Sequence, residues 1–231
     1  MNFVESPRAA QAFHFVRAHY EAATASASLV YRFDDGPDLI ETIRFADDTL
    51  PIPPGREAAL SEALRLLHLI AGISYYKAAV PERIVVAGEA LDPDLAALMD
   101  SVYLHDLGEF AHRNGLDLRG RIRFPHDDHV PTAAAHIGLP RRTLVAIGGG
   151  KDSLVTVELL RAAHEPMTAT WVGRSPLIAA CVERSGLPRL NIDRQISPLL
   201  FEMNRHGAWS GHIPVTAINP AILVRAATLH G

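Results

Sequence analysis

Six consecutive residues in the middle of the chain have the types and the spacing that bind phosphate: Gly148, Gly149, Gly150, Lys151, Asp152 and Ser153. They follow an apolar run of strand length, 143–147, and precede a run with the composition of a helix, 154–163. Glycine lets the backbone approach an anion closely, and the free N–H groups and dipole of a helix start favour negative charge. The segment therefore predicts a phosphate-binding loop between a strand and a helix.

Two common phosphate loops fit this segment incompletely. The Walker A pattern requires Ser or Thr after its lysine, and here Asp152 follows the lysine while Val145 takes the position of the first glycine. The dinucleotide pattern G-x-G-x-x-G fits through two glycines, but Ser153 stands where the third is required. The next strand is followed by Arg174 rather than by an acid for the ribose, and an arginine could accept a 2′-phosphate. A dinucleotide site stays open as an alternative, and so does a flexible turn.

The pattern Ser-Gly-Gly-Lys-Asp-Ser matches the loop better, at five of six positions, with Gly148 in place of the first serine. In this respect the chain resembles the ATP pyrophosphatases, or PP-loop family. These enzymes cleave ATP between its α- and β-phosphates and pass AMP to an oxygen of the substrate. The resemblance implies ATP and Mg²⁺ as cofactors, and a backbone N–H would replace the missing hydroxyl donor.

A closer resemblance runs through most of the chain from about Phe13 onward. Four segments are similar to the ATP-dependent epimerases that invert the terminal glutamate of UDP-N-acetylmuramoyl-L-alanyl-L-glutamate; the segments are 66–79, 104–124, 144–154 and 204–219. Members of that family are longer than this chain. The resemblance implies an isomerase of peptidoglycan biosynthesis that converts L-Glu to D-Glu on a UDP-muramoyl dipeptide by carboxyl adenylation, releasing AMP and diphosphate.

The chemistry of glutamate inversion agrees with this family. A carbanion beside a carboxylate is unfavourable, and joining AMP to the carboxylate removes its charge and makes the α-proton more acidic. Racemases without cofactors often use two cysteines, whereas this chain has only Cys181. A pyridoxal enzyme needs a Schiff-base lysine, and the chain offers only Lys77 and Lys151, the second within the loop.

The hydrogen-bond donors and charges of the loop residues suggest a role for each. Backbone N–H groups of Gly149, Gly150 and Asp152, with the Ser153 hydroxyl, would hold the leaving diphosphate. Lys151 would act in catalysis by neutralising charge that grows between the α- and β-phosphates. Asp152 would act in catalysis by holding magnesium. A helix N-cap is the structural alternative for Asp152, and the two roles can coexist.

Residues outside the loop give weaker signals. His212 lies in the loop 209–214 and could be the general base or acid, since histidine titrates near neutral pH; a solvated polar residue is the alternative. Lys77, beside Tyr75 and Tyr76, could contact the phosphates of a UDP-sugar or could mark an exposed helix end. The histidine-rich segment 126–129 matches no zinc pattern and predicts a solvated linker.

Composition narrows the class of protein. The 231 residues are 48% hydrophobic, enough for a packed core, and the net charge of −4 disfavours a nucleic-acid partner. Cys181, which we expect to be a small apolar side chain buried on a helix, is the one cysteine of the sequence, so an internal disulfide is excluded, which suits a reducing compartment. The start lacks the pattern of a signal peptide, and no run reaches the length of a membrane span. These features predict a cytoplasmic enzyme without membrane insertion.

The first half of the chain predicts a small α+β domain over residues 1–125. Apolar runs at 29–33 and 39–45 flank turn-forming residues and predict a hairpin. A helix should begin near Glu57, and another should start at Pro93 with Asp92 as its cap and run to about Arg113, ending at Gly115. Short strands are expected at 84–86 and 121–124. Residues 126–142 should form a linker.

Residues 143–231 predict a Rossmann-like nucleotide-binding domain. Strands at 144–147, 167–172 and 189–192 alternate with helices at 153–163 and 176–184, which favours a parallel sheet. The ligand should lie beyond the carboxyl ends of the strands, where Gly148, Gly173 and 191–193 emerge, so Gly173 joins the nucleotide-binding candidates. A helix at 198–204 and a last helix capped by Asn219, with Pro220 first, complete the prediction.

Three strands make a small nucleotide-binding sheet. We therefore expect an α/β chain whose second domain is incomplete at its carboxy-terminal side. The last helix is apolar on most faces, and a parallel edge without a neighbour invites association, so we expect a homodimer or an aggregation-prone fragment with weak or no epimerase activity. A non-catalytic nucleotide-binding fragment, or another AMP-forming ligase or amidase of the PP-loop family, remain as alternative functions.

Overall fold

The computed structural model describes residues 6–130 and 137–231. The strands are β1 (Ala12–Glu21), β2 (Ser26–Phe33), β3 (Leu39–Arg44), β4 (Arg83–Val86), β5 (Thr143–Ala146), β6 (Met167–Val172) and β7 (Arg189–Gln195). The α-helices are α1 (Glu57–Ala71), α2 (Ile73–Tyr76), α3 (Pro93–Asp106), α4 (Gly108–Asn114), α5 (Lys151–Ala162), α6 (Pro176–Ser185), α7 (Pro198–Arg205) and α8 (Val215–His230). The chain is therefore α/β, as the sequence predicted.

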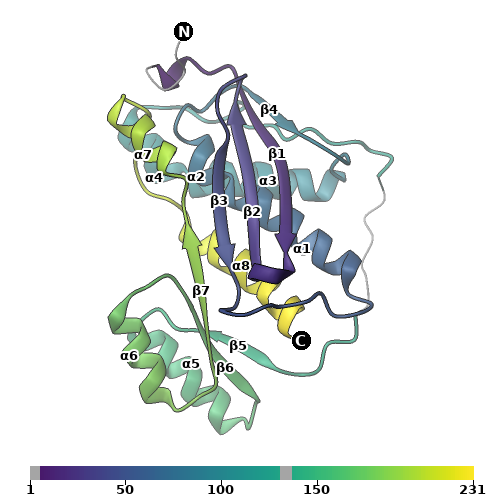
Figure 1. Ribbon diagram of the computed structural model, residues 1–231. Coiled ribbons are helices and arrows are strands. Elements are labelled where there is room, and N and C mark those ends of the chain that lie inside the picture. The colour runs from purple at the N-terminus through teal and green to yellow at the C-terminus, as the bar shows by residue number, and fades with distance from the viewer. Residues whose placement is uncertain (1–5, 131–136) are drawn as a thin grey trace.

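The described strands form one seven-stranded sheet in the order β4-β1-β2-β3-β7-β6-β5. Strands β1, β2 and β3 are antiparallel neighbours, and β4 joins β1 in parallel. Strands β5, β6 and β7 are parallel, and β7 pairs antiparallel with β3. A single antiparallel junction thus joins the meander of the first half to the parallel strands of the second half (Figure 1).

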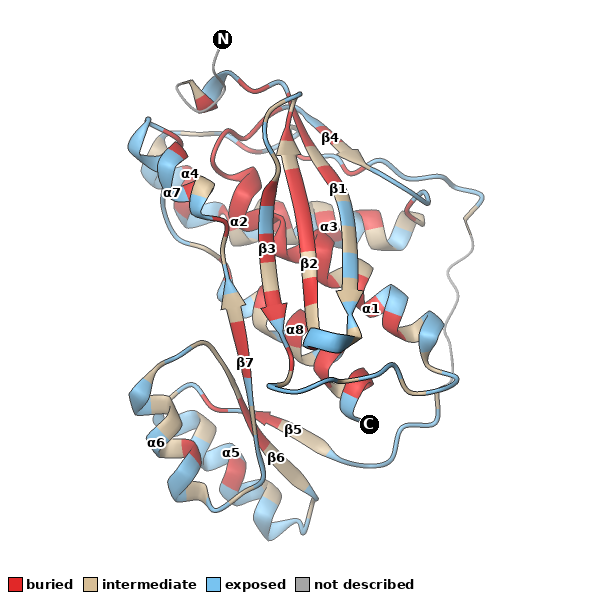
Figure 2. Ribbon diagram, in the orientation of Figure 1, coloured by how far each residue is buried: buried red, intermediate tan, exposed pale blue. Residues whose placement is uncertain are grey.

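The main core lies between the strands of the first half and helices α1, α2, α3 and α8 behind them (Figures 1 and 2). The β2–β3 hairpin has the predicted turn: Asp34 takes a positive φ of 45°, and its Oδ1 accepts a 2.8 Å hydrogen bond from the Ala12 N–H. The turn therefore also fixes the start of β1. Helix α1 begins at Glu57 as predicted and buries the face that carries Leu60, Leu64 and Leu67.

The parallel strands have a separate and much smaller core. It consists of five buried residues, Val145, Ile147, Val157, Ala169 and Val182, with partly buried neighbours from α5 and α6. Figure 2 shows this contrast, since α5 and α6 are mostly exposed or intermediate while the helices behind β1–β3 carry much of the buried surface. The alternation of strands and helices in this half follows the sequence prediction.

Strand β1 was missed because its alternation of apolar and polar residues is interrupted. Phe13 and Phe15 face the core, and the pairing with β2 shifts between Phe15 and Arg17. Such a bulge moves later side chains to the opposite face. The predicted strand at 121–124 is wrong: the segment is irregular, and the N–H of Phe124 bonds to the Asp100 carboxylate at 2.7 Å rather than to a strand.

Two helix predictions also need correction. The helix capped by Asp92 ends at Asp106, and α4 then continues to Asn114 before the left-handed Gly115. The last helix begins at Val215, so Asn219 is not its cap and Pro220 lies within it. Proline removes one backbone hydrogen bond, but α8 packs along α1 and gains buried area that offsets the loss.

Helix α8 lies against the first half of the chain, although it follows the parallel strands in sequence. Its Arg225 is almost fully buried, donates from Nη1 to the Leu60 carbonyl at 2.6 Å and lies over the Tyr20 ring. Burial lowers the pKa of Arg225 to about 10. None of the helices in the part of the chain that the structure describes is long and apolar enough to span a membrane.

Candidate functional site

The segment predicted to bind phosphate, 148–153, spans the turn after β5 and the start of α5. Gly149 has a φ of +79°, and a Cβ there would lie 3.3 Å from Cγ1 of Ile178 in α6. A side chain at this position would thus be strained by its backbone and crowded by its neighbour. Gly148 and Gly150 have open space around them. Gly149 is therefore the position of the three at which the fold itself requires glycine.

The first turn of α5 faces solvent without a side-chain cap. Gly150 is the N-cap residue, and among the described residues no side chain caps the first-turn N–H groups. Asp152 is the second residue of the helix, so the N-cap alternative for Asp152 is wrong. The Ser153 hydroxyl donates to the Gly150 carbonyl at 2.9 Å. Uncapped N–H groups at the start of a twelve-residue helix suit an anion.

Lys151 and Asp152 carry exposed side chains at this helix start. In the described part of the chain, no ion pair or side-chain hydrogen bond involves the Lys151 ammonium or the Asp152 carboxylate. The described residues contain no group of three or more His, Cys, Asp and Glu side chains placed to hold a metal. A magnesium ion at Asp152 would therefore take most of its oxygen ligands from phosphate and water, which is usual for this cation.

A second group of polar residues lies where β6 ends. Gly173 follows β6 with a φ of +94°; its N–H donates to the Ile192 carbonyl, and its carbonyl accepts from Asn191 Nδ2 at 2.9 Å. Arg174 donates from Nε and Nη2 to the two carboxylate oxygens of Asp193 at 3.0 and 2.6 Å. The carboxyl ends of β5 and β6 lie side by side at the same end of the sheet, because these strands are parallel neighbours.

The Arg174–Asp193 pair combines an exposed cation with a buried carboxylate. The Arg174 side chain is 72% exposed and that of Asp193 is 8% exposed. Hydrogen bonds from Arg174 and then from Gln195 hold the pKa of Asp193 below its usual value. The carboxylate thus stays ionised and fixes the guanidinium in a bidentate geometry while the rest of the cation faces solvent. The residue type and position of Arg174 predict a phosphate ligand, whereas its partner Asp193 comes from the next strand and is evident only in the fold.

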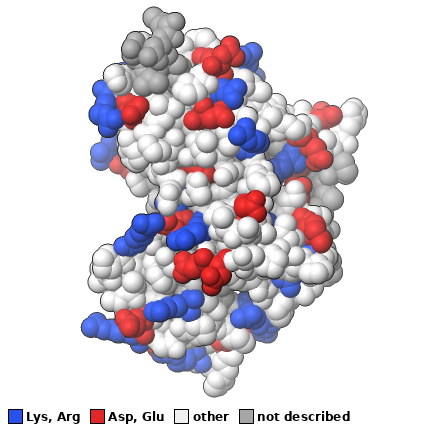
Figure 3. All heavy atoms as spheres, in the orientation of Figure 1, with Lys and Arg blue, Asp and Glu red and all other residues white. Residues whose placement is uncertain are grey.

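Figure 3 shows that the molecule is indented between its upper part, which carries α7, and its lower part, which carries α5 and α6. Lys, Arg, Asp and Glu side chains of both signs gather below this indentation. A mixed-sign surface suits a small anionic ligand bound together with a cation better than it suits a nucleic-acid backbone, which needs a continuous basic face.

His212 lies in the segment between α7 and α8, and its side chain is exposed. The segment is fixed by its neighbours: the Trp209 N–H donates to the Ala78 carbonyl at 2.9 Å, Asn114 Nδ2 donates to the Ser210 carbonyl, and Lys77 Nζ donates to the Gly211 carbonyl at 2.8 Å. In the described part of the chain, the His212 imidazole has no hydrogen bond or ion pair. The structure therefore gives His212 a fixed backbone but no oriented ring.

Lys77 does not mark an exposed helix end. It is 5% exposed, and burial lowers the pKa of its ammonium. Tyr75 and Tyr76 are fully buried; Tyr75 Oη accepts from the Ser197 N–H, and Tyr76 Oη donates to the Pro81 carbonyl. The mixed polar and aromatic composition of this segment thus reflects core packing and anchoring of the His212 loop. A buried lysine could have been suspected from its place within an otherwise apolar helical run.

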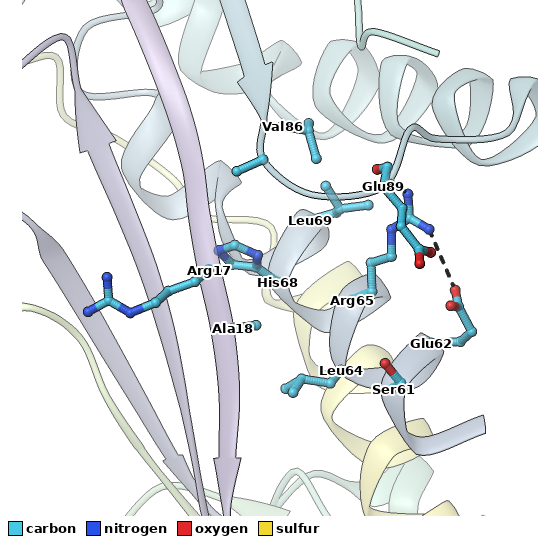
Figure 4. Close-up of a pocket in the computed structure, with 11 residues that line it drawn as sticks. Arg17, Ala18, Ser61, Glu62, Leu64, Arg65, His68, Leu69, Val86 and Glu89 are labelled. Carbon is cyan, nitrogen blue, oxygen red and sulfur yellow. Dashed lines mark hydrogen bonds and ion pairs between the residues drawn. The ribbon is translucent and has the colours of Figure 1, made fainter. Parts of the chain in front are cut away.

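A separate hollow lies on the first half of the chain, between β1, α1 and the segment after β4 (Figure 4). Its volume is about 240 Å³. The lining includes Arg17, Glu62 and Arg65, with His68 at its inner side. Arg65 donates to the carbonyls of Glu89 and Ala90. This hollow is small and its main cation is already engaged, so the helix start of α5 is the better candidate site.

A family model and three curated relatives of this chain all point to one protein family. The family model described as MurL N-terminal domain matches residues 4–231. A protein of Xanthomonas oryzae pv. oryzae named UDP-N-acetyl-alpha-D-muramoyl-L-alanyl-L-glutamate epimerase is 55% identical over 219 residues, which cover 95% of this chain and 49% of that protein.

Two further relatives carry the same name. Those of Salinispora tropica and Micromonospora sp. are 40% and 41% identical, over 98% of this chain and 50% and 51% of their own lengths. The chain thus spans about half the length of the curated relatives it matches. No solved structure matched the chain.

Proposed function

This chain belongs to the family of UDP-N-acetyl-alpha-D-muramoyl-L-alanyl-L-glutamate epimerases, whose N-terminal domain it matches, and on that basis we propose that it holds the nucleotide site of such an enzyme. The reaction we propose inverts the terminal L-Glu of UDP-MurNAc-L-Ala-L-Glu to D-Glu with consumption of ATP, during peptidoglycan synthesis in the cytoplasm. The observation that carries this proposal is the uncapped start of α5 behind a glycine that the fold requires, Gly149.

The fit of ATP and Mg²⁺ to this site rests on its donors. N–H groups of Gly149 and Gly150 and of the first helical turn are suited to phosphate oxygens, and no side chain in residues 6–130 or 137–231 caps this helix start. Bound ATP would supply AMP to the glutamate carboxyl, which removes the charge that opposes loss of the α-proton. Lys151 would stabilise the charge on the departing diphosphate. Asp152 would supply a carboxylate ligand to magnesium.

Proton transfer at the α-carbon needs groups on both faces of the substrate. His212 is our candidate for one of them, because its imidazole is exposed on a loop whose backbone is anchored by Lys77, and histidine is a common general acid or base. Arg174, held by Asp193, is suited to an anionic group of either substrate. The half of the relatives that this chain does not span would supply the remaining groups for proton transfer. The UDP-muramoyl dipeptide is the substrate partner that we propose.

A binding measurement tests the nucleotide site directly. The 231-residue chain is titrated with ATP in the presence of Mg²⁺ by calorimetry, and Lys151→Met and Asp152→Asn are compared with Glu158→Gln, an exposed acid on the same helix. We expect each loop variant to bind at least about tenfold more weakly, the effect of losing one charge-assisted contact, and the control to bind normally. Unchanged ATP binding by both loop variants would show that this loop is not the ATP site.

The reaction is tested in a full-length relative. Diphosphate release and the configuration of the glutamate are measured with ATP, Mg²⁺ and the UDP-muramoyl dipeptide, and replacement of the aspartate equivalent to Asp152 by alanine should abolish release. Release of diphosphate with retained L-configuration would instead support an AMP-forming ligase or amidase. ATP binding by this chain without any reaction would support the second candidate, a nucleotide-binding unit that is not catalytic alone, which its coverage of only half the relatives favours.

A further inference from the structure

Strand β5, which leads into the phosphate loop, lies at the edge of the sheet. The Thr143 N–H donates to the carbonyl of Pro166, just before β6, at 2.9 Å, and the N–H of Ile147, just after β5, donates to that of Thr170 within β6 at 2.8 Å. Because N–H groups alternate in direction along a strand, those of Leu144 and Ala146 point to the other side. No described strand pairs with that side. The β5 edge is thus a row of open backbone donors and acceptors.

Helix α5 beside this edge is apolar on two faces. Val157 is its buried residue, at 2% exposure, and packs in the small core of the parallel strands. Val155 and Leu159 are 55% and 67% exposed. They are four residues apart and therefore adjacent on the helix surface, and they lie away from the buried face. A helix with apolar residues on opposite faces is expected to be covered on both sides.

The direction of the strand order supports the same conclusion. Strands β5, β6 and β7 follow one another to one side only, in the order β7-β6-β5. In doubly wound sheets the strand that carries the phosphate loop lies at the point where the order reverses, and the ligand binds in the crevice between it and the next strand on its other side. This crevice requires a parallel neighbour on the free side of β5.

We propose that the β5 edge and the exposed α5 face, defined by Leu144, Ala146, Val155 and Leu159, bind the half of the epimerase that this chain does not span. The partner chemistry is a parallel β-strand flanked by an apolar surface. The matched family model is an N-terminal domain, and the curated relatives are about twice as long, so each contains as much chain again beyond the matched half. Pairing at this edge completes the phosphate crevice.

A second copy of the chain fits this surface less well. Two copies related by a two-fold axis would pair β5 with itself, and such self-pairing is antiparallel. An antiparallel partner would not reproduce the parallel neighbour that the crevice requires. The surface is therefore assigned to the other half of the enzyme rather than to a homodimer, although the exposed edge also explains why the isolated chain is expected to associate.

Amide hydrogen exchange tests this proposal by comparing the protection of β5 and α5 in the 231-residue chain and in a full-length relative. The 231-residue chain and the full-length relative from Xanthomonas oryzae pv. oryzae are analysed without nucleotide, so the result does not depend on ATP chemistry. We expect amides of β5 and of the exposed α5 face to exchange at least about tenfold more slowly in the relative. Amides of α3, on the other half, should exchange equally. Equal exchange at β5 and α5 in both proteins would overturn the proposal.

Substitutions on this surface distinguish the two candidate partners, the other half of the enzyme and a second copy of the chain. Two surface variants of the chain are each co-expressed with the other half of the relative: the double variant Val155→Glu/Leu159→Glu, and Ala146→Pro. The matched control is Leu98→Glu on α3, whose side chain is 48% exposed. We expect recovery of the complex to fall at least tenfold for both surface variants and not for the control, with unchanged circular dichroism of the chain. If these variants instead dissociate a dimer in sedimentation and leave the complex intact, the occupant is a second copy and the assignment is wrong.

Discussion

Glu41 of β3 and Arg194 of β7 form a buried ion pair across the one junction that joins the two parts of the sheet. Arg194 Nε lies 2.8 Å from Glu41 Oε1, and the side chains are 9% and 0% exposed. Arg194 Nη2 also donates to Ser74 Oγ at 3.0 Å, so the pair reaches helix α2. Burial by itself would lower the pKa of Arg194, but the charge of Glu41 and the hydrogen bond to it raise that pKa above its usual value. The position of β7, and of the site beyond it, thus depends on this pair.

Removing one partner of this pair should destabilise the protein strongly. Glu41→Gln keeps the shape but leaves Arg194 as an unpaired buried cation, and loss of one partner of a buried pair costs about 3–5 kcal/mol. Arg194→Met should cost a similar amount, because Glu41 is then unpaired. The double variant should recover part of the loss. Urea denaturation of all four proteins measures the coupling, and additive losses would show that the two charges do not support each other.

Stability should fall in acid because of His68. Burial lowers the pKa of His68 from 6.5 to about 4, and its Nε2 lies 3.1 Å from the Val30 carbonyl, to which the neutral ring donates. Between these values the unfolded chain binds a proton that the folded chain does not, so stability is lost as the pH falls from 6.5 towards 4, by up to about 3 kcal/mol.

The measurement is urea denaturation at pH 7.5 and at pH 5. His68→Gln removes the titration, and we expect a smaller difference between the two pH values for this variant than for the natural chain. His230 contributes in the same direction, since burial also lowers its pKa, so His230→Gln serves as the comparison. An equal pH dependence in His68→Gln and the natural chain would contradict the assignment.

Substitution of two glycines of the loop, Gly149 and Gly148, should affect stability and ATP binding differently. Gly149→Ala meets both a φ of +79° and a contact at 3.3 Å, which should cost about 1–3 kcal/mol or displace the loop. Gly148→Ser has open space and restores the serine of the PP-loop pattern. We expect Gly148→Ser to melt normally and to bind ATP at least as well as the natural chain. Calorimetry and thermal melts check both, and weaker ATP binding by Gly148→Ser would argue against a PP-loop arrangement of phosphate.

The full-length enzyme should prefer the nucleotide-sugar dipeptide to free L-glutamate. Binding energy from parts of a substrate remote from the reacting carbon can be used to stabilise the transition state. We expect kcat/KM for free glutamate to be lower by about 100-fold or more, equivalent to about 3 kcal/mol. Diphosphate release with each substrate at equal concentration measures this ratio. Comparable values would count against the wall-precursor substrate.

Local patterns predicted most of the second half. The apolar runs, the glycines at 148–150 and the helix composition after them identified β5, the loop and α5 without reference to other parts of the chain, because strand–loop–helix units depend on near neighbours. The first half was predicted less well. The bulge in β1 interrupts its alternation, and the segment at 121–124 bonds to an aspartate of α3 that is distant in sequence.

The residues of the candidate site also divide into those predicted by local sequence patterns and those placed by contacts between distant segments. Sequence alone determined the family and predicted the phosphate loop and the class of chemistry, because each depends on residue types at short, fixed spacing. Only the tertiary structure decided that Asp193 fixes Arg174, that Lys77 is buried beneath the His212 loop, and that β5 lies at an open edge. These relationships join segments far apart in the chain, and their pairing is set by strand register and core packing, which no local pattern encodes.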